Sequence, residues 1–67
     1  MEIFAKRILE LRNKAGLTRE QFCNQTGIST RTLQRYEYGE REPNLSTLIT
    51  FAKFYNVSLD YLAGLEE

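Results

Sequence analysis

The sequence predicts an all-α domain built from five short helices. Apolar residues recur at helical spacing in five segments, N-cap residue types stand before four of them, and no segment alternates with the two-residue period of a strand. The chain has 67 residues and is expected to form one domain spanning residues 1–67. A domain of this size buries only roughly 60% of the surface that its unfolded chain exposes, so we expect marginal stability.

The first two helices are predicted from an apolar stripe and a capping motif. The first should run over about Ile3–Lys14, and Gly16 behind it favours a helix stop. The second follows Thr18, which forms a capping box with Gln21 three residues later. The stripe of the first helix consists of Phe4, Ile8, Leu11 and Ala15.

The third helix forms a pair with the second across a short turn. It should begin after Ser29 and end near Tyr38, where Gly39 can take the left-handed conformation that closes a helix. The apolar residues of the pair share an inner face: Phe22, Cys23, Ile28, Leu33 and Tyr36. The polar residues left on the outside of the third helix are Thr30, Arg31, Gln34 and Arg35.

Two helices joined by a short turn containing glycine, with such a polar outer face, are typical of the helix-turn-helix. In that motif the second helix enters the DNA major groove. Tyr36 has an aromatic ring that could stack on a base, but its spacing from Leu33 favours the core.

The last two helices are predicted near the C-terminus. The fourth starts at Leu45, after the N-cap type Asn44, and runs for about three turns with apolar residues on nearly all sides, so we expect it to be the core helix of the domain. The fifth should cover Leu59–Ala63, between Ser58 as N-cap and Gly64 as stop.

The charge balance predicts a modest electrostatic attraction to DNA. Nine basic and nine acidic residues give no net charge, although Arg31 and Arg35 are the only charged residues between Gln21 and Tyr36. Because only charges on the contacting face act within a Debye length of about 8 Å, the local pattern matters more than the sum. Few phosphate contacts per subunit are then expected, which favours use as a dimer.

Composition argues against several other classes of protein. A single cysteine, Cys23, and no histidine exclude an internal disulfide and a Cys/His zinc site, so no metal or cofactor is expected. Cys23 is interpreted as a core residue, with a redox-sensing thiol as the alternative. There is no glycine-rich phosphate loop or paired carboxylates, which disfavours an enzyme with a small-molecule substrate. The N-terminus has no apolar segment of the kind found in signal peptides or membrane spans, and a cytoplasmic protein without membrane association is expected.

Several motifs, in order, carry a resemblance to a known family. The segments ILELRNKAGLTREQF, TGIS, LQRYEYG and PNLSTLITFAKFYNVSLDYL resemble the lambda-repressor-like XRE (Cro/repressor) helix-turn-helix family over a core of about residues 3–64. The resemblance implies a bundle of five helices in which the second and third bind DNA. It implies base-reading positions at Thr30, Arg31 and Arg35, flanked by Gln34, and here an arginine can bond guanine bidentately.

The start of each helix of the pair and the loop that follows are interpreted as phosphate contacts. Backbone N–H groups at the start of the second helix favour an anion. The residues expected to meet phosphate are Thr18, Arg19, Gln21, Ser29, Thr32, Tyr38 and Arg41. Family members commonly pair an arginine at the end of the first helix with a glutamate at the end of the third, which matches Arg12 and Glu37 as a structural salt bridge.

The C-terminal part carries more aromatic surface than five short helices need. We therefore predict a two-fold homodimer through Phe54, Tyr61 and Leu65. The function predicted overall is a prokaryotic or phage transcriptional regulator, a repressor acting as a dimer on a palindromic operator in double-stranded DNA. The alternative is an antitoxin or a protein-interaction module on the same fold, with a toxin or sensor as partner and DNA binding secondary.

Overall fold

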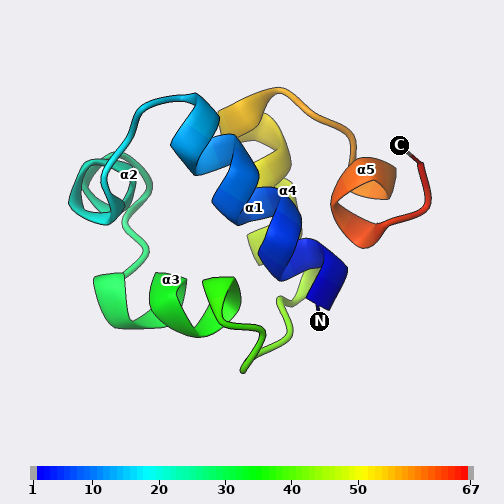
Figure 1. Cartoon of the computed structure of the whole chain (residues 1–67), viewed down its shortest axis with the longest axis horizontal. Coiled ribbons are helices and arrows are strands. Elements are labelled where there is room, and N and C mark those ends of the chain that lie inside the picture. Colours follow the sequence, from blue (N-terminus) through cyan, green and yellow to red (C-terminus); the bar gives the residue numbers. More distant parts are fainter. Residues whose placement is uncertain (1, 67) are drawn as a thin grey trace.

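Five α-helices make up most of the chain in the computed structural model, which describes residues 2–66 (Figure 1). They are α1 Glu2–Lys14, α2 Arg19–Thr26, α3 Thr30–Glu37, α4 Leu45–Tyr55 and α5 Leu59–Ala63. The described residues contain no strand. The all-α fold with five helices is therefore confirmed, and the helix limits agree with the predicted ones to within one residue.

The N-cap residues explain where the helices begin. The side chains of Thr18, Ser29, Asn44 and Ser58 each accept a hydrogen bond from the backbone N–H three residues further on. Each of these four residues has an extended backbone, as an N-cap requires. The predicted capping box at the start of α2 is complete, with the Gln21 side chain accepting from the backbone N–H of Thr18.

The core is built around three phenylalanines from three different helices. Phe4 of α1, Phe22 of α2 and Phe51 of α4 are fully buried. The Phe51 ring centroid lies 5.3 Å from that of Phe4 in an edge-on arrangement and 5.1 Å from that of Phe22 in a stacked one. Both arrangements are favourable for aromatic pairs. The other buried members of this cluster are Ile8, Cys23, Leu33, Tyr36 and Leu62.

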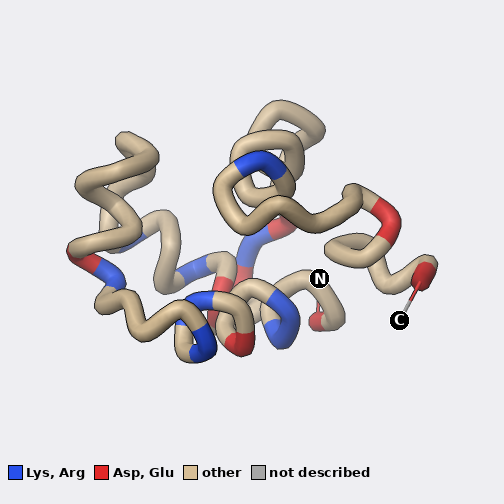
Figure 2. The backbone as a smooth tube through the Cα atoms, turned by 90° about the horizontal axis from the view of Figure 1, so that it is seen from above, with Lys and Arg blue, Asp and Glu red and all other residues tan. Residues whose placement is uncertain are grey.

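Helix α1 lies across the front of the other helices. In Figure 1, α1 crosses the front of the molecule with α2 to its left, α3 below, α4 behind it and α5 to its right. Helix α1 packs against both α3 and α5, while α2 packs on α3 and α4 on α5. Figure 2 shows charged positions of both signs along α1, whereas α4 carries the single charged residue Lys53.

Two expectations about apolar residues need correction. Helix α4 does supply much of the core, because Phe51 is fully buried and Leu48, Ala52, Phe54 and Tyr55 pack against the cluster. It is not covered on all sides, however, since Leu45 is 64% exposed and Ile49 is exposed as well. A helix at the surface of so small a domain is covered on one side only, so an apolar sequence all round does not make a central helix. Ala15, assigned to the buried stripe of the first helix, follows the last helical residue and is exposed.

Candidate nucleic-acid interface

The inner faces of α2 and α3 fix the relative position of the two helices. Phe22, Cys23, Leu33 and Tyr36 are buried and Ile28 is partly buried, as predicted. Three residues, 27–29, separate the helices. Gly27 takes the left-handed φ of 81°, and its N–H bonds the carbonyl of Cys23 to close α2. The turn is therefore short and defined, which holds α3 at one angle to α2.

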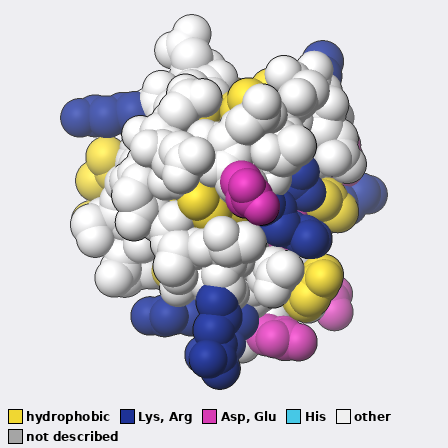
Figure 3. All heavy atoms as spheres, turned by 90° about the vertical axis from the view of Figure 1, so that its left-hand side faces the viewer, with side chains coloured by type: hydrophobic (Ala, Val, Ile, Leu, Met, Phe, Trp, Pro, Cys, Tyr) yellow, Lys and Arg dark blue, Asp and Glu magenta, His cyan; other side chains and the backbone are white. Residues whose placement is uncertain are grey.

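The outer face of α3 is polar and open to solvent. Thr30, Arg31 and Arg35 are exposed, and Gln34 is partly exposed between them. Figure 3 shows Lys and Arg side chains projecting from the lower part of this side of the molecule, where Figure 1 has α3. Within residues 2–66, the ion pairs involve neither Arg31 nor Arg35. Both guanidinium groups are available to an external partner.

Two shallow depressions lie on either side of Gln34. One lies between the starts of α2 and α3 and is lined by Arg12, Thr18, Arg19, Glu20 and Thr30. The other lies along α3 and the loop that follows it and is lined by Arg31, Arg35, Tyr38 and Glu40. Most of the sequence-predicted site residues thus line one of the two depressions in this surface, namely Thr18, Arg19, Thr30, Arg31, Gln34, Arg35 and Tyr38. Glu20 and Glu40 border that surface, so its positive charge is confined to α3 and Arg19.

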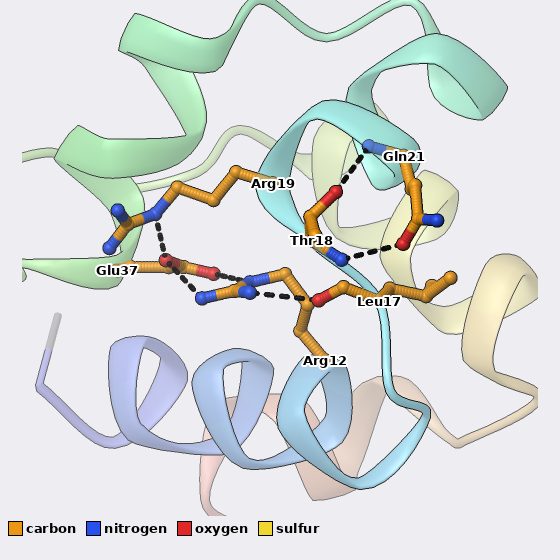
Figure 4. A network of polar contacts seen from close by, with 6 residues as sticks. All are labelled: Arg12, Leu17, Thr18, Arg19, Gln21 and Glu37. Carbon is orange, nitrogen blue, oxygen red and sulfur yellow. Dashed lines mark hydrogen bonds and ion pairs between the residues drawn. The ribbon is translucent and has the colours of Figure 1, made fainter.

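A buried carboxylate connects this surface to α1 (Figure 4). The side chain of Glu37 is 1% exposed and accepts hydrogen bonds from Arg12 Nε at 2.7 Å, Arg12 Nη2 at 3.2 Å and Arg19 Nε at 2.8 Å. Arg12 Nη1 also donates to the carbonyl of Leu17 at 2.9 Å. The expected Arg12–Glu37 pair is present, and it is satisfied by further hydrogen bonds, as a buried ion pair requires.

Arg19 is a partner of Glu37 that sequence reasoning missed. Its guanidinium carbon lies 5.5 Å from the centroid of the Tyr38 ring, and the hydrogen bond to Glu37 raises its pKa above the ordinary value. The sequence contains one signal for this contact, namely a glutamate at a position on the inner side of α3. That signal does not say which arginine will reach it, because Arg19 is 18 residues away in the chain.

Several predicted phosphate-contacting residues already make hydrogen bonds in the cap regions. Thr18 Oγ1 accepts from the N–H of Gln21 at 3.1 Å. Ser29 Oγ accepts from the N–H of Thr32 at 3.1 Å and donates to Thr32 Oγ1 at 2.8 Å. The first N–H groups of α2, those of Arg19 and Glu20, have no acceptor within the helix.

The loop after α3 places its two predicted residues differently. Tyr38 is 62% exposed and lies under Arg19. Arg41 is also exposed, and its guanidinium carbon lies 5.8 Å from the Tyr36 ring centroid. A cation over a buried ring covers the core from outside, so Arg41 combines a structural contact with an accessible charge.

The three residues predicted at a dimer interface have unlike surroundings. Phe54 is partly buried, with its ring centroid 4.8 Å from that of Phe22 and 4.9 Å from that of Tyr55. Tyr61 lies under the Arg7 guanidinium, 4.2 Å from ring centroid to guanidinium carbon. Leu65 is 77% exposed. Two of the three therefore already pack within their own subunit.

Comparison with known proteins identifies the family. A family model described as Helix-turn-helix matches residues 8–62, which is most of the chain. The chain belongs to the XRE-type helix-turn-helix family. The matched region contains all of α2, α3 and α4.

Relatives of this helix-turn-helix chain are transcriptional regulators by name. The HTH-type transcriptional regulator ImmR of Bacillus subtilis (strain 168) is 40% identical over 62 residues, covering 92% of this chain and 49% of ImmR. The cryptic phage CTXphi transcriptional repressor RstR of Vibrio cholerae is 34% identical over 62 residues, covering 92% of this chain and 56% of RstR. The chain thus spans about half the length of these curated relatives.

A solved structure has the same arrangement of helices. The crystal structure of a transcriptional regulator from Listeria innocua superposes with a TM-score of 0.84 at 31% identity, covering 96% of this chain and 60% of that chain.

Among residues 2–66 of the present helix-turn-helix protein, no helix has the length and apolar character to cross a bilayer. The same residues hold no group of three or more His, Cys, Asp or Glu side chains that could bind a metal ion.

Proposed function

We propose that this protein is a sequence-specific double-stranded DNA-binding regulator of transcription that inserts α3 into the major groove. The observation that carries the proposal is the outer face of α3. It presents Arg31 and Arg35, free of ion pairs within the described residues, on a helix whose opposite face is fixed in the core. An arginine held in this way can bond O6 and N7 of guanine, and Thr30 and Gln34 add polar contacts through shorter side chains.

The start of α2 is proposed to bind the DNA backbone beside the groove. The N–H groups of Arg19 and Glu20, the positive end of α2 and the Arg19 side chain favour a phosphate there. Thr18, Gln21, Ser29, Thr32 and Arg41 are proposed to complete the phosphate contacts on either side of α3, and Tyr38 lies beside them under Arg19. Such contacts orient the domain without reading sequence.

We infer dimeric binding to a palindromic operator from the small number of charges on one subunit. One subunit offers few arginines to phosphate, so counterion release by one subunit is limited. Two subunits would place their α3 helices in successive major grooves, about 34–36 Å apart. Phe54, Tyr61 and Leu65 are proposed at the dimer contact, with Leu65 as the exposed side chain available to it.

Oligomeric state can be tested directly with the exposed leucine. Sedimentation of wild type and of Leu65→Asp, with and without DNA, should give a dimer for the first and a monomer for the second. A monomeric wild type at high micromolar concentration in both conditions would contradict the dimer.

The regulatory role proposed is repression in the cytoplasm, by occupation of an operator. The relative RstR is named a transcriptional repressor, which supports this sign of regulation. A protein-interaction module, such as an antitoxin or a domain docking on a sensor, is the second candidate. The exposed apolar residues Leu45 and Ile49, one helical turn apart on α4, favour it because they face solvent in the isolated chain.

The decisive experiment is selection of bound sequences from random double-stranded DNA, followed by affinity measurements on the selected site. Arg31→Ala and Arg35→Ala should each weaken specific binding by about 1–3 kcal/mol and relax the preference at one base position. Lys53→Ala is the matched control, because it removes an exposed positive charge from α4, outside the α2–α3 surface. If both arginine variants bind as tightly as wild type, α3 does not read the DNA.

A further inference from the structure

Arg19 is held in place from two sides by its own protein. Its Nε donates to Glu37 Oε1 at 2.8 Å, and its guanidinium carbon lies 5.5 Å from the centroid of the Tyr38 ring. Its side chain nevertheless stays 30% exposed. The chain therefore restricts the rotamers of an arginine at its surface while leaving part of the guanidinium open to solvent.

Glu37 does not need Arg19 for its own neutralisation. Arg12 already gives the carboxylate two hydrogen bonds, one to each oxygen. With one carboxylate and two arginines, the cluster carries one net positive charge. Arg12 and Arg19 both line the depression beside Thr30 and Gln34, and Arg19 is the more exposed of the two cations, at 30% against 11% of the side chain.

The free edge of Arg19 is directed toward the proposed interface. Among residues 2–66, the hydrogen bonds of its side chain involve Nε alone, so both Nη groups keep their donors. Figure 4 shows these two nitrogens on the far side of Glu37, pointing away from Arg12 and α1. The same cluster thus joins the end of α1, the start of α2 and the end of α3.

We propose that Arg19 is a pre-positioned phosphate anchor and that Tyr38 acts as a positioning residue through it, without contacting DNA itself. The inference rests on the proposed DNA-binding function and deepens it. A flexible surface arginine loses rotamer freedom when it binds phosphate, and ordering it beforehand reduces that loss. Because Glu37 lies on α3, the clamp also fixes the distance between the phosphate anchor and the base-reading face.

A double-mutant cycle with a salt series tests this role. Affinity for the selected DNA site is measured for wild type, Arg19→Gln, Tyr38→Leu and the double variant at several salt concentrations. Arg19→Gln should lower the slope of log K against log salt by about one per bound subunit and weaken all sequences equally. When Arg19 is present, Tyr38→Leu should weaken binding roughly two- to fivefold, as expected for the loss of an exposed cation–π contact. In the Arg19→Gln background it should have no effect.

Tyr38→Phe is the matched control, because it keeps the ring and removes the hydroxyl. It should bind as wild type does, and circular dichroism should show that all variants are folded. A Tyr38→Leu loss of equal size in both backgrounds would overturn the inference, since Tyr38 would then contact DNA directly. In that case the proposed function would still stand, provided that the wild-type protein binds DNA base-selectively and its affinity falls with rising salt. Absence of any salt-dependent DNA binding by wild type would overturn both.

Discussion

Helix α3 has eight residues, and its inner and outer faces differ in burial and in chemistry. Leu33, Tyr36 and Glu37 are buried and make contacts with α1 and the aromatic core, whereas Arg31 and Arg35 point to solvent. A substitution on one face therefore leaves the contacts of the other in place. The inner residues of α3 therefore stabilise the fold, whereas the outer arginines carry the proposed DNA specificity.

The largest expected loss of stability follows from removing the buried charge of Glu37. Glu37→Gln leaves Arg12 buried without a counter-charge, which typically costs 3–5 kcal/mol. This is of the order of the whole stability of a small domain, so we expect a mostly unfolded protein by circular dichroism. Glu42→Gln, at an exposed loop position, is the matched control and should melt as wild type does. A Glu37→Gln variant within about 1 kcal/mol of wild type would mean that the network is not structural.

The apolar part of the inner face should rank next. Leu33 is buried, and Leu33→Ala removes its side chain from the core at an expected cost of about 2–5 kcal/mol. Urea unfolding gives the value, with Leu45→Ala at an exposed site of α4 as control, expected within about 0.5 kcal/mol of wild type. Equal effects of the two substitutions would contradict the packing described for α3.

Loss of the N-cap of α3 should have an intermediate effect on the unfolding free energy. Ser29→Ala removes the acceptor for the N–H of Thr32 and should cost about 1 kcal/mol in unfolding free energy. Ser29→Asp keeps an acceptor and should retain most of the stability in the same thermal melts. If both substitutions cost the same, the cap does not determine where α3 begins.

A further effect is confined to alkaline pH. Burial raises the pKa of Tyr55 to about 12, above its value of about 10 in an unfolded chain. The folded state therefore holds the phenolic proton more tightly, and stability present below pH 10 is lost as the pH rises through 12. Tyr55→Phe should show a smaller decline in unfolding free energy over this range than wild type. Parallel declines would assign the alkaline loss to other groups.

The smallest effect on stability is expected on the outer face. Arg31→Ala and Arg35→Ala should each change the unfolding free energy by no more than about 0.5 kcal/mol, because neither side chain is in an ion pair of the described residues. Combined with the loss of DNA affinity proposed above, this result would separate the two faces most sharply. A large destabilisation would instead mean that the outer arginines hold the fold.

The sequence by itself determined the five helices and the polar face of α3. Caps, capping box and apolar spacing act within three or four residues, so Thr18, Gln21 and Ser29 could be assigned from local chemistry. The same local rules misjudged α4, because an apolar helix does not reveal how many neighbours will cover it. Leu45 and Ile49 are exposed for that reason.

The tertiary structure decided which charges meet. Arg19 pairs with Glu37 across 18 residues, and Arg7 donates to the carbonyl of Tyr61 across 54. No local pattern encodes such contacts, because they depend on the angles at which helices pack around the phenylalanine core. The sequence thus specified where the helices are and which face of α3 is polar. Only the packing of the helices placed the Arg19 guanidinium over the Tyr38 ring, next to that face.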